Sequence, residues 1–336
     1  MIKLIGGNTV DDKHSEVFRQ YDLKVYNMYR ARGAFLLETN QGLKLFKCFE
    51  DSENHLLYEN KVKGVLVNKG FSNVDVILPN KEGGFVTADS AGTKYIIKNW
   101  FEGEECNLKD LKDIYAASKN LARIHNALEG IREDEETSIC QPHLAELFDK
   151  HNKELKRVKT YIWNKKQRND FELTFLLIFE FFYEDAKKAT SLLEACYYNR
   201  FYEECLKKGL GCHGNYTYHN ILITKEGIAV TNFEKCCCGV QIMDLYQLFR
   251  KCMEKNNWDK NYGHTILNGY ESVRSISKEE YHILYLMLLY PEKFWKVTNY
   301  YINNKKSWIS SRNIQKLTIL QQQAPCKEEF LKEFFP

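Results

Sequence analysis

The sequence predicts an α+β fold in which a small β-rich N-terminal lobe precedes a larger helical C-terminal lobe. Short alternating runs separated by turn residues fill roughly the first hundred of the 336 residues, as antiparallel strands do. Further along, apolar residues recur at helical spacing, apart from one short hairpin. The change falls at the polar segment EGEECN (102–107), so we expect an N-terminal lobe at 1–102 and a C-terminal lobe at 103–336.

The N-terminal elements follow from period-two patterns and turn residues. The runs GAFLLET and LKLFKCF flank the turn sequence NQG and predict a β-hairpin. Lys47 interrupts the apolar face of the second of these strands. A helix is predicted over 53–70, with Gly70 as its C-terminal stop. The predicted strands of this lobe are 33–39, 43–49, 74–79 and 94–101.

The C-terminal lobe is predicted to be mainly helical. A continuous apolar stripe runs through LKDIYAASKNLARIH (111–125), and charged helical patterns occupy roughly 143–208. A hairpin follows, with strands at 221–223 and 228–233 around the turn TKEG. The chain from 241 to its end returns to helical patterns.

Composition excludes several classes of function. Lys and Arg total 48 against 45 acidic residues, and a net charge of +3 is too small to indicate nucleic-acid binding. The apolar runs FLLIFEFFY and YHILYLMLLY are about half a membrane span, and the N-terminus turns polar too early for a signal peptide. We therefore expect synthesis in the cytoplasm, no membrane span, and 11 largely reduced cysteines.

Two charged residues fit the binding of nucleotide phosphates. Phosphoryl transfer uses a strand lysine that grips the phosphates and a helix glutamate that orients it. Lys47 on a predicted strand and Glu59 on the predicted helix have this order. Glu59 also shares the apolar stripe of its helix with Val62 and Leu66. The alternative is a chance surface ion pair, because both residue types are common.

The segment CHGNYTYHN (212–220) has the spacing of a phosphotransferase catalytic loop. Asn220 follows Asn215 at the interval of the kinase D-x-x-x-x-N element. His213 precedes Asn215 in the same loop, and His219 precedes Asn220. The alternative for the two histidines is that they are ordinary interior residues.

Two further positions extend the pattern beyond the loop. Asn232 ends the predicted hairpin, where a kinase places its second metal-binding aspartate. Asp244 starts the next helix, where its carboxylate is placed to accept backbone N–H bonds from the loop and hold it. The ordered set predicts a bilobal protein-kinase-like fold.

Several longer segments carry a resemblance to a known family. The segments are CHGNYTYHNILI, AVTNFEKC, QIMDLYQLFRKCMEKNNW, LLETNQGLKLFK, LARIHNA and YPEKFWKVTNYYINNKKSWIS. They resemble the CotS-type spore coat protein family, a branch of the aminoglycoside and choline phosphotransferase-like superfamily, over roughly residues 20–330. The resemblance implies an aminoglycoside phosphotransferase-like fold and a place in the endospore coat or its assembly, with synthesis in the mother cell.

The chain departs from that superfamily at two positions. Phosphotransferases of this type have aspartate where Asn215 and Asn232 stand. An amide is a poor base, and the loss of a general base costs about 10²- to 10⁴-fold in rate. Asn232 also removes a negative charge from the expected place of Mg²⁺, which favours carboxylate oxygens. Impaired catalysis is therefore expected.

One nearby carboxylate offers a replacement. Glu234 lies two residues beyond Asn232, so its side chain points to the same side if the strand continues; surface exposure is the alternative. ATP and Mg²⁺ are the cofactors to consider. The candidate metal ligands are Asn220, Asn232 and Glu234, and the candidate nucleotide-binding residues are Lys47, Glu59 and the hinge residues Asn99 to Phe101.

Three functions remain open at this point. The first is a pseudokinase component of the spore coat that binds other spore coat or morphogenetic proteins, in which the 21 tyrosines and 11 cysteines could enter oxidative cross-links. The second is an active ATP-dependent phosphotransferase that uses Glu234 and acts on an unknown small-molecule or protein acceptor. The third is a nucleotide-binding switch without phosphoryl transfer.

Overall fold

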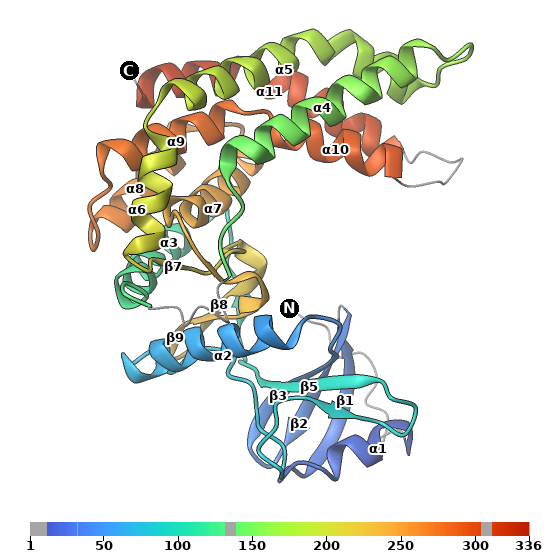
Figure 1. Ribbon diagram of the computed structural model, residues 1–336, viewed down its shortest axis with the longest axis vertical. Coiled ribbons are helices and arrows are strands. Elements are labelled where there is room, and N and C mark those ends of the chain that lie inside the picture. Colours follow the sequence, from blue (N-terminus) through green and yellow to red (C-terminus); the bar gives the residue numbers. More distant parts are fainter. Residues whose placement is uncertain (1–11, 32, 132–138, 304–310, 336) are drawn as a thin grey trace.

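The computed structural model describes residues 12–31, 33–131, 139–303 and 311–335. It consists of a small lobe built around an antiparallel sheet and a larger helical lobe (Figure 1). This confirms the α+β, bilobal fold that the sequence predicts. The first eleven residues, on which the expectation about a signal peptide rests, lie outside the described residues.

The sheet of the small lobe has the order β1-β2-β3-β5-β4, and its neighbouring strands are antiparallel. The predicted NQG turn joins β2 to β3, with Gly42 at a φ of 82° that favours glycine. The helix α1, Asp12–Phe18, packs Phe18 edge-on against Phe46 of β3. The strands are β1 Val25–Ala31, β2 Ala34–Thr39, β3 Gly42–Cys48, β4 Thr87–Ala88 and β5 Lys94–Asn99.

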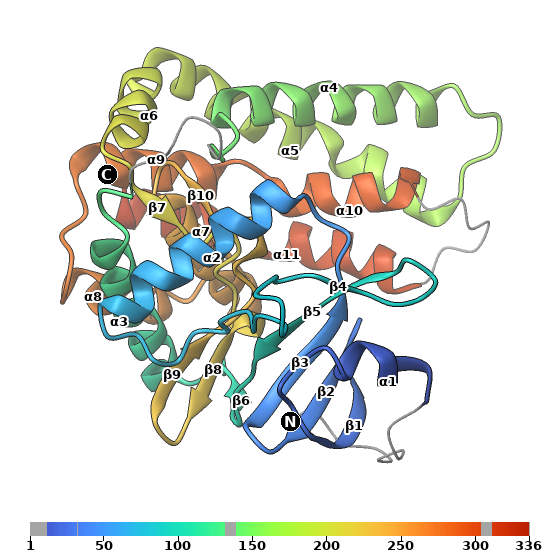
Figure 2. The same ribbon diagram turned by 60° about the horizontal axis from the view of Figure 1, so that its bottom comes forward.

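The helix α2, Glu53–Asn68, lies between the sheet and the helical lobe (Figures 1 and 2). Ser52 caps its N-terminus by accepting a hydrogen bond from the His55 N–H at 3.2 Å. Leu56 packs with residues of the small lobe, whereas Val62 belongs to the core of the helical lobe. The helix therefore joins the two lobes through opposite faces.

The helical lobe contains one continuous core in its described residues. Two of its helices begin with a capping box, at Asn169 with Glu172 and at Ser277 with Glu280. Among the described residues, we find no helix with the length and apolar character needed to cross a membrane. The helices are α3 Leu111–Ala127, α4 Leu144–Trp163, α5 Asp170–Ala195, α6 Tyr198–Lys207, α7 Ile242–Lys255, α8 Lys260–Glu271, α9 Lys278–Leu289, α10 Glu292–Asn303 and α11 Ser311–Phe334.

Short strands surround the loop at 213–220. The hairpin of β8, Ile221–Thr224, and β9, Gly227–Val230, pairs with β6, Glu104–Glu105. On the other side of the loop in sequence, β7, Gly211–Cys212, pairs with β10, Cys237–Cys238. These two small sheets hold the loop at both of its ends.

Two sequence predictions about strands are wrong. The segment 74–79 makes only single bridges to its neighbours, at Val74 and Ile77, because the Val76 N–H turns back to the Val74 carbonyl at 2.8 Å and interrupts the ladder. The hairpin strand predicted to reach 233 ends at Val230, because Asn232 has a left-handed backbone with φ 62° and ψ 57°.

Candidate functional site

A cleft of about 940 Å³ lies between the lobes and contains several of the predicted residues. The small lobe contributes β1 to β3 and the hinge after β5; the helical lobe contributes the loop at 213–220 and helices α4, α7, α9 and α10. Gly33 lines it at the turn between β1 and β2. The residues singled out from the sequence that line the cleft include Lys47, Asn215, His219, Asn220 and Asn232.

Asp244 holds the loop from behind. Its two carboxylate oxygens accept hydrogen bonds from the backbone N–H groups of His213 and Gly214, at 2.6 and 2.8 Å. The buried ring of His125 contacts the same carboxylate at 3.2 Å. Gly214 has a φ of 76°, and a Cβ there would lie 1.7 Å from the Lys235 carbonyl oxygen. The loop thus needs both a carboxylate at 244 and a glycine at 214.

His213 is a neutral structural residue. Its Nδ1 accepts a hydrogen bond from the Asn215 N–H at 3.1 Å, so its Nε2 carries the proton donated to the Thr231 carbonyl at 3.1 Å. Burial lowers the pKa of the His213 imidazole. The ring fixes Asn215 relative to the hairpin and is completely buried.

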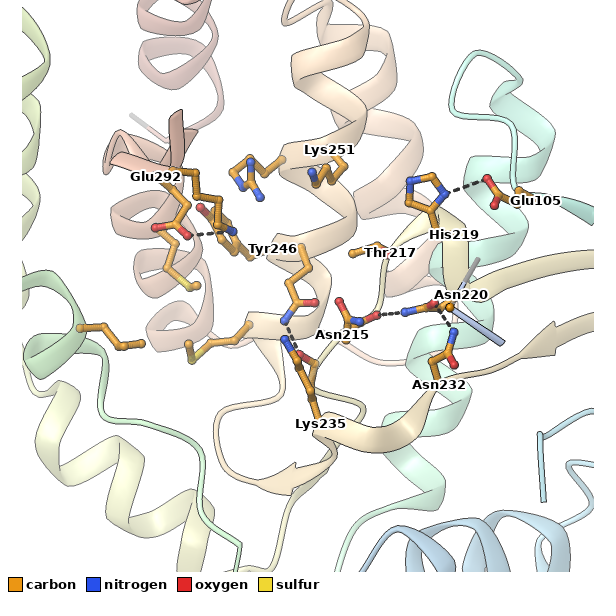
Figure 3. Close-up of a pocket in the computed structure, with 18 of the residues that line it drawn as sticks. Glu105, Asn215, Thr217, His219, Asn220, Asn232, Lys235, Tyr246, Lys251 and Glu292 are labelled. Atoms are coloured by element: carbon orange, nitrogen blue, oxygen red, sulfur yellow. Dashed lines mark hydrogen bonds and ion pairs between the residues drawn. The ribbon is translucent and has the colours of Figure 1, made fainter. Parts of the chain in front are cut away.

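The amides at the expected metal site bind each other. Asn232 Nδ2 donates a hydrogen bond to Asn220 Oδ1 at 2.8 Å, and Asn220 Nδ2 donates one to the Asn215 backbone carbonyl at 2.8 Å (Figure 3). The Asn232 N–H is held by the Asp75 carboxylate at 2.8 Å. This arrangement does not fit Mg²⁺, which favours carboxylate ligands, and the described residues contain no group of three His, Cys, Asp or Glu placed to hold a metal.

Glu234 is occupied by two lysines. Because the strand ends before it, Glu234 lies in the 3₁₀ turn Phe233–Lys235 and does not line the cleft. Its Oε1 lies 2.7 Å from Lys47 Nζ and 3.0 Å from Lys98 Nζ. Burial would raise the pKa of the Glu234 carboxyl, but Lys98 and Lys47 lower it to about 2. The geometry assigns Glu234 to these lysines rather than to a metal ion.

Lys47 does not pair with Glu59 as expected but with Glu234, and Glu59 pairs with other lysines. Glu59 pairs with Lys98 of β5 at 2.7 Å and with Lys63 of its own helix at 2.5 Å, so its carboxylate is already neutralised where Lys47 would approach. Lys63 also binds Asp75 Oδ1 at 2.8 Å. The result is a network of three lysines and three carboxylates in which Lys47 and Glu234 are partly exposed and the other four are buried; Lys47 alone lines the cleft.

Sequence reasoning missed Lys98, Lys63 and Asp75. A detectable signal existed for Lys98, which interrupts the apolar run of its strand KYIIKN as Lys47 interrupts its own. At the hinge, Trp100 lines the cleft, whereas Asn99 and Phe101 do not. The hinge segment therefore contributes to the cleft through Trp100, and its role in nucleotide binding stays a prediction.

The fold and the cleft define a protein with a kinase-like, phosphotransferase-type fold. The family described as the spore coat putative kinase YutH matches residues 14–334, and the chain belongs to it. Spore coat protein S of Bacillus subtilis (strain 168) is 20% identical over 315 residues, which cover 90% of this chain and 86% of that protein. The spore-coat resemblance of the sequence is thereby confirmed.

Two solved structures share the fold. An aminoglycoside phosphotransferase from Alicyclobacillus acidocaldarius has a TM-score of 0.84 at 18% identity and covers 97% of this chain and 96% of its own. Spectinomycin phosphotransferase APH(9)-Ia, in complex with ADP and spectinomycin, has a TM-score of 0.70 at 11% identity, with 97% and 98% covered. These likenesses support the architecture described above.

Proposed function

We propose that the chain is a catalytically impaired, kinase-like component of the endospore coat. The observation that carries this proposal is the hydrogen bond between Asn232 and Asn220, which joins two neutral amides at the positions predicted to bind a metal ion. Asn215 supplies another amide where the superfamily has its catalytic aspartate. Without a general base, transfer is slowed by about 10²- to 10⁴-fold.

The coat setting rests on the family. Membership of the spore coat kinase family and likeness to spore coat protein S support synthesis in the mother cell and a final place in the coat. The partners would be other spore coat or morphogenetic proteins. Cross-linking through thiols would be confined mainly to Cys48 and Cys140, because the other nine cysteines are buried or partly buried.

A second candidate is a switch that binds nucleotide without transferring phosphate. The cleft supports it, since its volume suits a small-molecule ligand. Leu36, Leu45 and Trp100 offer apolar surface for a base, and Lys47 offers a charge for phosphates. The bound ADP of the spectinomycin phosphotransferase occurs in a protein of the same fold. The N-terminal lobe of this protein would consist of residues 1–102 and the C-terminal lobe of residues 103–336.

The test is ATP binding by calorimetry and ATP turnover, each with and without Mg²⁺, for the natural chain and for Lys47→Ala. Impaired catalysis predicts no turnover above background. Binding that does not depend on Mg²⁺ and weakens in Lys47→Ala would favour the switch. Absence of binding would direct the search to coat-protein partners alone. Turnover that requires Mg²⁺ would contradict the proposal and support an active phosphotransferase.

A further inference from the structure

The helical end of the cleft is built differently from the end that contains the asparagines. In Figure 3, Tyr246, Lys251 and Glu292 lie together, apart from Asn220 and Asn232. Tyr246 and Lys251 belong to α7 and both line the cleft, and Glu292, which also lines it, begins α10. If a nucleotide binds at the end of the cleft that contains Lys47, a second ligand would bind at this end, opposite the nucleotide.

Positive charge is in excess there. Around Lys251 the structure gathers four cations against two carboxylates, an excess of two positive charges: Arg250, Lys251, Lys293 and Lys296, with Glu254 and Glu292. Arg250, Lys251 and Lys296 line the cleft, and Glu292 is the one carboxylate of this group that does. The local field therefore attracts anions and repels amines.

The carboxylates are already used by other cations. Arg250 and Lys293 bind Glu254, the latter at 3.5 Å. Lys296 binds Glu292 at 2.9 Å, and the His151 ring lies 3.6 Å from the same carboxylate. Among the described residues, Lys251 has neither a hydrogen bond nor an ion pair.

Arg250 provides an independent sign of an incomplete site. Its side chain is 8% exposed, yet its Nε has no hydrogen-bond acceptor in the described part of the chain. A buried donor without an acceptor costs about 1–3 kcal/mol. Burial and the adjacent Arg250 also lower the pKa of Lys251 to about 8. The fold thus holds Lys251 beside Arg250 without an ion pair to a carboxylate, among the described residues.

Apolar side chains complete the same end of the cleft. Leu147 and Phe148 of α4, Met243 of α7 and Met287 of α9 line it. The Phe148 ring is fixed by stacking on Tyr290, with ring centroids 4.0 Å apart. A ligand here would meet an apolar wall beside the cations.

We propose that the α4–α7–α10 end of the cleft binds a small organic anion, a phosphate or carboxylate attached to a short apolar body, with Lys251 and Arg250 as the groups that recognise the charge. The inference rests on the proposed function in one respect, that this cleft is the ligand-binding cleft of the kinase-like fold. The anion neutralises Lys251, and its apolar body contacts the wall formed by Phe148 and Met243.

The test uses phenyl phosphate, with benzyl alcohol and benzylamine as neutral and cationic probes of similar size. Calorimetry on the full chain should show binding of phenyl phosphate, with the other two at least about tenfold weaker. Lys251→Met should weaken phenyl phosphate about tenfold or more, and Lys296→Met, at an exposed position, should weaken it severalfold. Lys207→Met, an exposed lysine of α6 outside the cleft, should change nothing.

Three results would overturn the inference. The first is benzylamine binding as tightly as phenyl phosphate, and the second is unchanged phenyl phosphate affinity in both Lys251→Met and Lys296→Met. Lys47→Ala separates the two ends of the cleft. If phenyl phosphate affinity falls in Lys47→Ala but not in Lys251→Met, the anion binds at the nucleotide end and the inference fails. ATP turnover in the same samples would contradict impaired catalysis and leave the anion site standing.

Discussion

Asn232 Nδ2 and Asn220 Oδ1 are joined by a hydrogen bond of 2.8 Å across the place where a kinase-like site would hold a metal ion. Asn220 accepts this hydrogen bond through its Oδ1 and donates another through its Nδ2 to the Asn215 carbonyl. This chain of neutral amides needs no metal ion to offset its charge, whereas two carboxylates at positions 220 and 232 would repel each other. The structure therefore accommodates the missing charges locally.

Restoring a carboxylate should restore metal dependence. In Asn232→Asp the hydrogen bond to Asn220 is lost and a hard anionic ligand is created. We expect ATP to bind about tenfold more tightly with Mg²⁺ than without it, a difference of about 1.4 kcal/mol, whereas the natural chain should show little difference. Calorimetry measures both. The double variant Asn215→Asp with Asn232→Asp should also gain turnover; Mg²⁺-dependent binding by the natural chain would contradict this account.

The ion pairs of Glu234 predict how stability depends on pH. The pKa of its carboxyl is lowered from 4.5 to about 2, after burial has been offset by Lys98 and Lys47. A carboxyl whose pKa is lower in the folded state stabilises the fold at a pH above its pKa in the unfolded chain. This stabilisation is lost as the pH falls from about 4.5 toward 2. After allowance for solvent screening, Glu234→Gln should cost about 1–2 kcal/mol at pH 7.

Urea unfolding at pH 7 and at pH 3 checks this prediction. The difference between Glu234→Gln and the natural chain should shrink at the lower pH. Glu226→Gln, an exposed position in the turn between β8 and β9, is the matched control and should have little effect at either pH. An equal cost for Glu234→Gln at pH 7 and pH 3 would show that its charge is not responsible.

Asp75 should be the most sensitive carboxylate of the small lobe. It is completely buried, binds Lys63 at 2.8 Å and holds the Asn232 N–H. Asp75→Asn leaves Lys63 buried without full compensation, and breaking a buried pair from one side costs about 3–5 kcal/mol. Adding Lys63→Met should recover part of the loss in a double-mutant cycle. Asp149→Asn, in an exposed pair with Lys153, should cost less than about 1 kcal/mol.

The sequence predicted the fold because periodicity acts over short distances. The helix predicted at 53–70 is α2, and the NQG hairpin is β2 with β3. The strand β1 escaped prediction, since VYNMYRA lacks a clean alternation of apolar and polar residues. The segment 74–79 looked like a strand from its apolar residues, but a single backward hydrogen bond at Val76 interrupts its ladder.

The site was harder to predict because its charges pair across long sequence distances. Lys47 and Glu234 are separated by 187 positions, and no spacing rule connects them. The loop, by contrast, is contiguous, and its asparagines were recognisable by their interval. Lys98 competes with Lys47 for both Glu59 and Glu234, and that competition depends on the register of β3 with β5. The predicted pairing of Lys47 with Glu59 was therefore wrong, although Lys47 itself does line the cleft.

Lys251 predicts a conflict between stability and binding. Burial and Arg250 lower the pKa of Lys251 from 10.5 to about 8. The destabilising contribution of its charge is therefore fully present below about pH 8 and decreases as the pH rises to 10.5. Lys251→Met should therefore be more stable at pH 7, by about 1–2 kcal/mol after solvent screening. The gain should disappear near pH 10.5, and Lys207→Met should show no comparable gain.

A bound anion should make the natural chain more stable than Lys251→Met, which reverses their order of stability without the anion. At a phenyl phosphate concentration about 100 times its dissociation constant, ligand binding stabilises the natural chain by about 2.7 kcal/mol. Lys251→Met lacks the charge that recognises the anion and should gain much less. Thermal unfolding at pH 7 with and without phenyl phosphate measures both effects: the variant should melt higher without the anion and lower with it. Equal stabilisation of both proteins would show that Lys251 is merely an uncompensated charge and does not bind the ligand.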